Sequence, residues 1–263
     1  MKVSITKMLL SKLAIVKGFF GFPFPTRFRS ILLDSLDLTS KRGLLIPPLK
    51  LRRYIGKEDW KNYDNISLLT ENCGLKPNHK ILDVGCGCGR TAISLTSYLN
   101  SKGSYDGLDI VKDFIDWLQN NVTPKYPNFH FQHANIKNPS YNLNGTIADS
   151  KFKFPYESNS FDIVFLFSVF THMLPLGIEN YFSEIARVLK PNGKCAISYF
   201  LLPSKSMTFV DTGKGYSVID FEIPENAVAY KLEHVMELYT KNELLILEHI
   251  YGFQDMIIAK KGK

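Results

Sequence analysis

A short segment of the sequence combines one acid with three alternating glycines. Residues 80–90 read KILDVGCGCGR, so an apolar strand runs into Gly85, Gly87 and Gly89 before a helix begins. Glycines at such a turn let the main chain approach a ligand that side chains would block. Because ligands of open parallel sheets lie beyond the carboxyl ends of the strands, this loop predicts a ligand site. A glycine turn that binds nothing is the alternative.

The charges around this loop indicate which ligand it can hold. Asp83 lies two residues before the first glycine, where a carboxylate would repel a pyrophosphate but attract an ammonium and a sulfonium group. A dinucleotide fingerprint has its third glycine at position 90, where this chain has Arg90. Asp109, twenty residues after Gly89, is placed to accept the hydroxyl groups of a ribose or to cap the helix that follows. The pattern suits S-adenosylmethionine and disfavours an NAD-dependent oxidoreductase.

Apolar periodicity predicts the elements that position the loop. The predicted helices cover residues 59–73, 91–99, 111–122, 178–189 and 233–241. The predicted strands cover residues 80–84, 105–109, 129–133, 161–167, 194–201, 243–250 and 253–260. Strands that alternate with helices are typical of a parallel sheet with helices on both faces. Only Tyr251 and Gly252 join the last two strands, and such a short link permits only an antiparallel hairpin. The sequence therefore predicts an α/β fold with a doubly wound, mostly parallel sheet whose last strand is antiparallel.

The positive charge of the chain is concentrated at its start. Six basic residues and no acid occur up to Leu33, namely Lys2, Lys7, Lys12, Lys17, Arg27 and Arg29. They account for nearly all of the net charge of +7. The remainder is almost neutral, which disfavours nucleic acid as a partner because nucleic acid requires a basic face.

Residues 1–43 are therefore predicted to be a basic, apolar extension of a single domain over residues 44–263, with an insertion at about 202–226. Lysines interrupt the apolar run of the extension, which disfavours an export signal. At about 100° per residue they also surround a helix, so membrane-surface contact is only weakly supported. A helix that covers the active site or a partner subunit is the preferred interpretation, and the sequence leaves the oligomeric state open.

Cysteine and histidine positions bear on location and on metals. Four cysteines in 263 residues are too few for a disulfide scaffold, and Cys86 and Cys88 inside the glycine loop favour a reducing, cytoplasmic location. His130 and His133 point to opposite faces of a predicted strand, and no Cys-x-x-Cys occurs, so we expect no metal. No charge-free run is long enough to span a bilayer, which disfavours an integral membrane protein.

In combination, the motifs resemble the class I S-adenosylmethionine-dependent methyltransferases of the small-molecule type. The resemblance covers roughly residues 75–200. It is carried by Asp83-x-Gly85-x-Gly87-x-Gly89, by Asp109, and by three later segments, SFDIVF at 160–165, SVFTHM at 168–173 and ARVLKPNG at 186–193. The resemblance implies a seven-stranded Rossmann-like sheet, S-adenosylmethionine as cofactor and S-adenosylhomocysteine as product.

The resemblance also implies a role for individual residues. Asp83 would bind the amino group of the cofactor, Asp109 its ribose, and Ile110 its adenine ring. Where many relatives have an acid for the adenine amino group, this chain has Asn135, whose carbonyl group accepts the same hydrogen bond. The main chain of Phe167 and Ser168 would line the methyl-transfer cleft. The implied cofactor-binding set is Asp83, Gly85, Cys86, Gly87, Gly89, Asp109, Ile110, Ala134, Asn135, Phe167 and Ser168.

The sequence says less about the residues that bind the methyl acceptor and remove its proton. His172 is the candidate catalytic base because it follows the fourth strand and titrates near neutral pH, and a positioning role is its alternative. Tyr199 and Phe200 are either cleft walls or plain core. The motifs of enzymes that methylate nucleic-acid bases are absent, since Phe-Ser-Val-Phe follows the fourth strand and no Pro-Cys dipeptide occurs. The sequence therefore predicts methyl transfer to oxygen or nitrogen of a small molecule (sugar, lipid-like or other metabolite). A catalytically silent S-adenosylmethionine-binding interaction module is the alternative.

Overall fold

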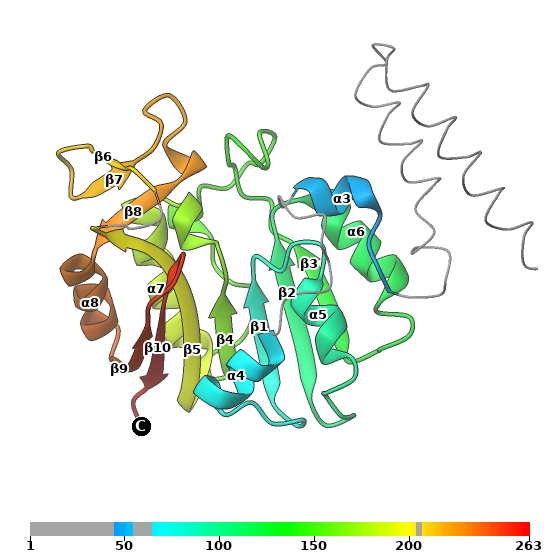
Figure 1. The fold of residues 1–263 in the computed structure, drawn as a ribbon. Helices are drawn as coiled ribbons and strands as arrows, with labels where there is room; N and C mark the ends of the chain where they lie inside the picture. Colours follow the sequence, from blue (N-terminus) through cyan, green and yellow to red (C-terminus); the bar gives the residue numbers. More distant parts are fainter. Residues whose placement is uncertain (1–44, 55–64, 204–206) are drawn as a thin grey trace, which may run out of the picture. The chain divides into compact units, whose positions relative to one another are not determined.

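The computed structural model describes residues 45–54, 65–203 and 207–263 (Figure 1). Its contacts divide the chain into two units, residues 1–58 and 59–263. The described part of the first unit contains α3 (Leu49–Tyr54), which begins directly after two prolines. The predicted extension over residues 1–43 lies outside the described residues, so its structure and its boundary at residue 44 stay predictions.

A single large sheet forms the centre of the second unit (Figure 1). Seven of its strands correspond to the predicted ones: β1 (Lys80–Val84), β2 (Ser104–Asp109), β3 (Phe129–His133), β4 (Phe161–Leu166), β5 (Leu189–Leu202), β9 (Leu244–Ile250) and β10 (Asp255–Lys261). They lie in the order β3-β2-β1-β4-β5-β10-β9. The first five pair in parallel, and β10 pairs antiparallel with both β5 and β9. This confirms the predicted fold class.

Both faces of this sheet are buried at its centre. The helices of this unit are α4 (Asn65–Cys73), α5 (Arg90–Leu95), α6 (Lys112–Asn121), α7 (Pro175–Val188) and α8 (Leu232–Lys241). In β1, Leu82 belongs to the apolar cluster that α7 and α8 share with the sheet, and its neighbour Ile81 is equally buried on the opposite face. Successive side chains of a strand point to opposite faces, so helices must cover both of them, as the doubly wound class requires.

Several boundaries differ from the predicted ones. The helix over 91–99 is shorter and ends at Leu95, and the helix over 178–189 begins earlier, at Pro175, which suits a first helical position. The predicted two-residue hairpin link was wrong, because residues 251–254 join β9 to β10. Of the predicted helix 59–73, α4 covers the end, and residues 59–64 lie outside the described residues.

The insertion at 202–226 contributes strands that the sequence did not predict. It contains β6 (Val210–Asp211), β7 (Tyr216–Val218) and the short helix η4 (Pro224–Asn226), and β8 (Val228–Lys231) follows directly. β8 pairs in parallel with the last residues of β5, and β7 pairs antiparallel with β8. β5 has 14 residues and is longer than β4 and β10, the strands on either side of it. Its last residues are therefore available to pair with β8. The sheet therefore has ten strands, three more than the seven predicted.

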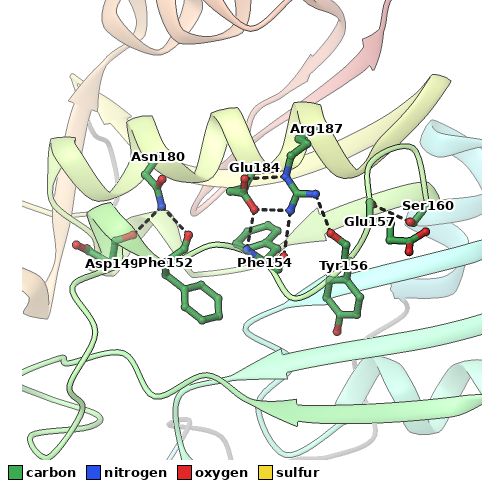
Figure 2. A network of polar contacts seen from close by, with 9 residues as sticks. All are labelled: Asp149, Phe152, Phe154, Tyr156, Glu157, Ser160, Asn180, Glu184 and Arg187. Carbon is green, nitrogen blue, oxygen red and sulfur yellow. Dashed lines mark hydrogen bonds and ion pairs between the residues drawn. The ribbon is translucent and has the colours of Figure 1, made fainter.

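The connection between β3 and β4 is fastened to α7 by side chains rather than by a crossover helix of its own (Figure 2). Glu184, only 8% exposed, accepts the N–H of Phe154 at 2.7 Å and a bond from Arg187 Nη2 at 2.6 Å. Arg187 also donates to the carbonyl oxygens of Tyr156 and Phe154, at 2.7 and 3.0 Å. Glu184 and Arg187 thus satisfy main-chain groups that a helix would otherwise satisfy internally.

None of the helices in the described parts of the chain is long and apolar enough to cross a membrane.

Truncating Glu184 tests this fastening. Glu184→Ala removes the carboxylate partner of the Arg187 guanidinium and the acceptor of the buried Phe154 N–H, and we expect the free energy of unfolding to fall by about 3 kcal/mol. Urea denaturation followed by circular dichroism measures this change. Glu237→Ala, at an exposed position of α8, is the control and should change it by less than about 0.5 kcal/mol. Equal effects of the two substitutions would contradict the role given to Glu184.

Candidate functional site

The glycine loop between β1 and α5 has a left-handed backbone at all three glycines. Their φ angles are 83° at Gly85, 55° at Gly87 and 88° at Gly89. A Cβ atom would lie 2.3 Å from a methyl group of Val169 at position 85, and 2.3 Å from one of Leu118 at position 89. Two of these glycines are therefore already required by packing within the protein. The sequence explained these glycines by the room that a ligand needs. Packing inside the protein is a second reason for glycine at positions 85 and 89.

Asp109, at the end of β2, holds the loop in place. Its Oδ2 accepts the N–H of Gly87 at 2.7 Å, and its Oδ1 accepts the N–H of Val111 at 2.8 Å, just before α6. Burial raises the pKa of Asp109 to about 6, although these main-chain bonds oppose the rise. The N-cap of α6 is Val111 and has no side-chain capping bond, so the alternative that Asp109 caps this helix was wrong, although Asp109 does bind the main chain just before it. Because each carboxylate oxygen has a second lone pair, bonds to a ribose remain compatible with these main-chain bonds.

Asp83 lies in the strand beside Asp109. Its carboxyl group is 3% exposed and accepts a hydrogen bond from the Tyr105 hydroxyl. Burial raises the pKa of Asp83 to about 8; the negative charge of Asp109 adds to the rise, and the Tyr105 hydroxyl opposes it. No cation contributes to this balance. Two neighbouring buried carboxylates of this kind fit a positively charged ligand and would repel a phosphate.

The residues after β2 and β3 lie beside this pair in the sheet. The N–H of Ala134 donates to the Asp109 carbonyl oxygen at 2.9 Å, which places the end of β3 next to Ile110. Asn135 is exposed, and its amide nitrogen donates to Thr146 Oγ1 at 2.9 Å. This bond leaves the amide oxygen of Asn135 as an acceptor, the property for which the sequence singled it out.

The end of β4 carries a conformation that is unusual for its residue type. Ser168 has a φ of 59° although it is not glycine, and its N–H donates to the buried Ser198 hydroxyl at 2.7 Å. Phe167, just before it, packs its ring against Phe165 at 4.8 Å between centroids. Non-glycine residues in the left-handed region are costly and concentrate at functional sites.

His172 lies at the end of the short helix η3 (Phe170–His172) and contacts the insertion. Its Nδ1 is 2.9 Å from the carbonyl oxygen of Glu225, and its ring contacts Tyr141 edge-on at 5.4 Å. A carbonyl oxygen only accepts, so Nδ1 carries the hydrogen and Nε2 is the nitrogen that can take a proton. Burial lowers the pKa of His172, so the ring is neutral near pH 7. Sequence reasoning missed this link, because nothing local to either segment indicates it.

The cysteines of the glycine loop and Tyr199 are packed inside the protein. Cys86 and Cys88 are buried, and burial raises the pKa of the Cys86 thiol well above its ordinary value, so it is not a nucleophile. Tyr199 is core, with its hydroxyl 2.9 Å from that of Tyr239. Within the described ranges, no three His, Cys, Asp or Glu side chains are grouped so that they could hold a metal ion.

Comparison with known proteins shows what part of this chain resembles a known family. A family model described as a methyltransferase domain matches residues 81–193. A crystal structure of a SAM dependent methyltransferase from Aquifex aeolicus superposes with a TM-score of 0.54 at 18% identity, covering 82% of this chain and 98% of that one. The family model thus shows a resemblance to a methyltransferase domain over residues 81–193, and the structural match, together with the sheet order, shows that the chain has the class I, Rossmann-like fold.

Two curated relatives match about half of the chain. Sterol 24-C-methyltransferase ERG6B from Gibberella zeae is 29% identical over 134 residues, which are 51% of this chain and 31% of that protein. The tRNA N(3)-cytidine methyltransferase METTL2 from Gallus gallus is 28% identical over 124 residues, 46% of this chain and 30% of that protein. The matched region is thus less than a third of either relative, and their names do not carry over to this chain.

The raised pKa values predict how stability varies with pH. The folded protein retains protons on Asp83 and Asp109 that the unfolded chain releases near pH 4. Their stabilising contribution is therefore complete below about pH 4 and is lost as the pH rises to about 8, so the free energy of unfolding of the ligand-free protein falls across this range. Urea denaturation between pH 5 and pH 8.5 measures the fall, and Asp83→Asn should make it smaller. An identical pH dependence in the variant would contradict the assignment to Asp83.

Proposed function

We propose that this chain transfers a methyl group from S-adenosylmethionine to an oxygen or nitrogen of a small molecule. The observation that carries the proposal is the pair of buried carboxylates, Asp83 and Asp109, at a glycine loop, where burial outweighs the interactions that would lower their pKa values. When bound, S-adenosylmethionine supplies a methyl group activated by a positively charged sulfur. Its ammonium and sulfonium charges complement the two carboxylates, whereas the pyrophosphate of a dinucleotide would not.

The residues proposed to hold the cofactor follow the ends of β1 to β4. Asp83 would bind the amino group, Asp109 the ribose, and the Asn135 amide oxygen the adenine amino group. Ile110 would pack against the adenine. The remaining members of the proposed set are Gly85, Cys86, Gly87, Gly89, Ala134, Phe167 and Ser168.

The other task of the protein is to hold the acceptor and remove its proton. Orientation of the acceptor can account for roughly 7–11 kcal/mol of the barrier. We assign His172 as the base, because its fixed Nδ1–H leaves Nε2 free to accept a proton and its lowered pKa keeps the ring neutral. Its bond to Glu225 supports a positioning role equally, and the two roles differ in kinetics.

The class of acceptor rests on charge and on the relatives. The near-neutral charge after residue 33 supports a small molecule over nucleic acid. The sterol substrate in the name of one relative supports a lipid-like acceptor, and the tRNA in the name of the other supports nucleic acid. A catalytically silent cofactor-binding module is the second candidate function, favoured by the internal packing roles of Gly85 and Gly89.

Calorimetry with S-adenosylhomocysteine tests the cofactor site. We expect the wild-type protein to bind it and Gly87→Val to abolish binding, since a β-branched side chain cannot adopt this φ without strain. Gly213→Val is the control, because Gly213 has a similar φ of 70° in the β6–β7 turn with open space around it. Denaturation curves show whether each variant folds. Tight binding by Gly87→Val, or none by the wild type, would refute the site.

A methyl-transfer assay with radiolabelled cofactor separates the enzyme from the silent module. The panel contains sugars, sterols, quinones, amines and unmodified tRNA. Label in a small molecule supports the proposal. Label only in tRNA would show that the acceptor is a nucleic acid and not a small molecule. Cofactor binding without transfer to any member of a broad panel favours the module.

The kinetics of His172→Ala distinguish a base from a positioning residue. For a base we expect kcat to fall by about 10²-fold or more, with KM for the acceptor changed less than about threefold. In the wild type, kcat should also decline as the pH drops below the lowered pKa of His172, because protonation removes the base. A loss that appears mainly in KM would assign positioning instead.

A further inference from the structure

Three polar side chains meet where β4 and β5 end and β10 begins. Ser168 follows β4, Ser198 lies in β5, and Gln254 immediately precedes β10. The N–H of Ser168 donates to Ser198 Oγ at 2.7 Å. The hydroxyls of Ser198 and Ser168 both donate to Gln254 Oε1, at 2.8 and 3.0 Å. These residues connect the left-handed turn after β4 to the β9–β10 hairpin.

The donors and acceptors of this group fix which way the Gln254 amide points. Ser198 Oγ already accepts from a main-chain N–H, so its own hydrogen needs an acceptor, and the residue is only 3% exposed. Gln254 Oε1 provides that acceptor. A reversed amide would leave the buried hydroxyl hydrogen of Ser198 unpaired, at a cost of about 1–3 kcal/mol.

This orientation leaves the donor end of Gln254 available. Its Nε2 carries two hydrogens, and no group in the described parts of the chain accepts from them. The side chain is half-buried, so the free donor lies at the protein surface rather than in the core.

Aromatic side chains adjoin these polar residues along β5 and along the β9–β10 hairpin. Phe200 projects from the same face of β5 as Ser198, because alternate residues of a strand share a face. Its ring contacts Phe209 at 5.3 Å and Phe253 at 5.8 Å between centroids. Phe253 precedes Gln254 and is 69% exposed, so part of this aromatic group faces solvent.

We propose that Gln254 and the three phenylalanines form the subsite for the methyl acceptor. The occupant would have an apolar body that packs on the exposed ring of Phe253, which the buried Phe200 supports, and a carbonyl or carboxylate oxygen that accepts from Gln254 Nε2. A cationic group would face two N–H donors there and be rejected. The inference deepens the proposed function, since Ser168, to which Gln254 is bonded, is one of the residues proposed to line the methyl-transfer cleft.

Three probes that share a phenyl ring and differ in polar group test the subsite. Benzoate, benzamide and benzylamine are titrated at millimolar concentration into ¹⁵N-labelled full-length protein, with and without S-adenosylhomocysteine. The Gln254 side-chain amide signals are assigned by their absence in Gln254→Met. We expect benzoate and benzamide to shift these signals and benzylamine to leave them unchanged.

Gln254→Glu sharpens the test. This variant keeps an oxygen for the two serines but exchanges the free donor for a second acceptor. We expect benzoate to bind at least about fivefold more weakly to it and benzylamine no more weakly than to the wild type. Gln132→Glu, at an exposed position of β3, adds the same charge and should change neither affinity by more than about twofold. Gln254→Met should also bind benzoate more weakly, and it replaces Gln254→Glu in this test if the glutamate disturbs folding.

The outcomes separate the two proposals. Unshifted Gln254 signals with every probe, equal binding of benzylamine, or full benzoate affinity in both Gln254 variants would overturn the subsite. If S-adenosylhomocysteine does not bind, the proposed function fails, while the contrast between the probes still decides whether the subsite exists.

Discussion

A single carboxylate, that of Asp109, joins the two chain segments from which the site is built. It accepts the N–H of Gly87 in the glycine loop and that of Val111 just before α6. A loop of left-handed glycines loses much backbone entropy on ordering, so it needs fixed partners to keep one conformation. Asp109 supplies an acceptor at the middle of the loop, and the carbonyl oxygen of Leu108 accepts from Gly85 and Cys86 at its beginning.

The same arrangement sets the electrostatics. Asp83 pairs with Gly107 in the neighbouring strand, so the geometry of the parallel sheet brings a second carboxylate near Asp109. Burying both is unfavourable in the ligand-free protein, which is why their pKa values rise. A cation at this edge of the sheet would reverse the penalty, since it stabilises the ionised form of both groups. The proposed selectivity for a positively charged ligand is thus a consequence of burial that the hydrogen bonds to the two carboxylates do not offset.

The parts predicted correctly from the sequence are those that local pattern determines. β1 and β3 have the predicted bounds because β1 is a short apolar run, β3 alternates apolar and polar residues, and both have polar turns around them. The glycine loop and its acids were visible because their chemistry depends on spacing along the chain. β8 was missed because its four residues become a strand only where the long β5 offers an unpaired edge. That condition is set by the tertiary structure and leaves no local signal.

The same distinction divides the site into two halves. The residues proposed to hold the cofactor form motifs of neighbouring residues, whereas those proposed to hold the acceptor come together through contacts between distant parts of the chain. The bond from His172 to Glu225 spans 53 residues, and those from Ser198 and Ser168 to Gln254 span 56 and 86. The family match ends at residue 193, before Ser198, Glu225 and Gln254. The family match therefore covers the residues proposed to hold the cofactor, and the acceptor has to be inferred from the residues that follow.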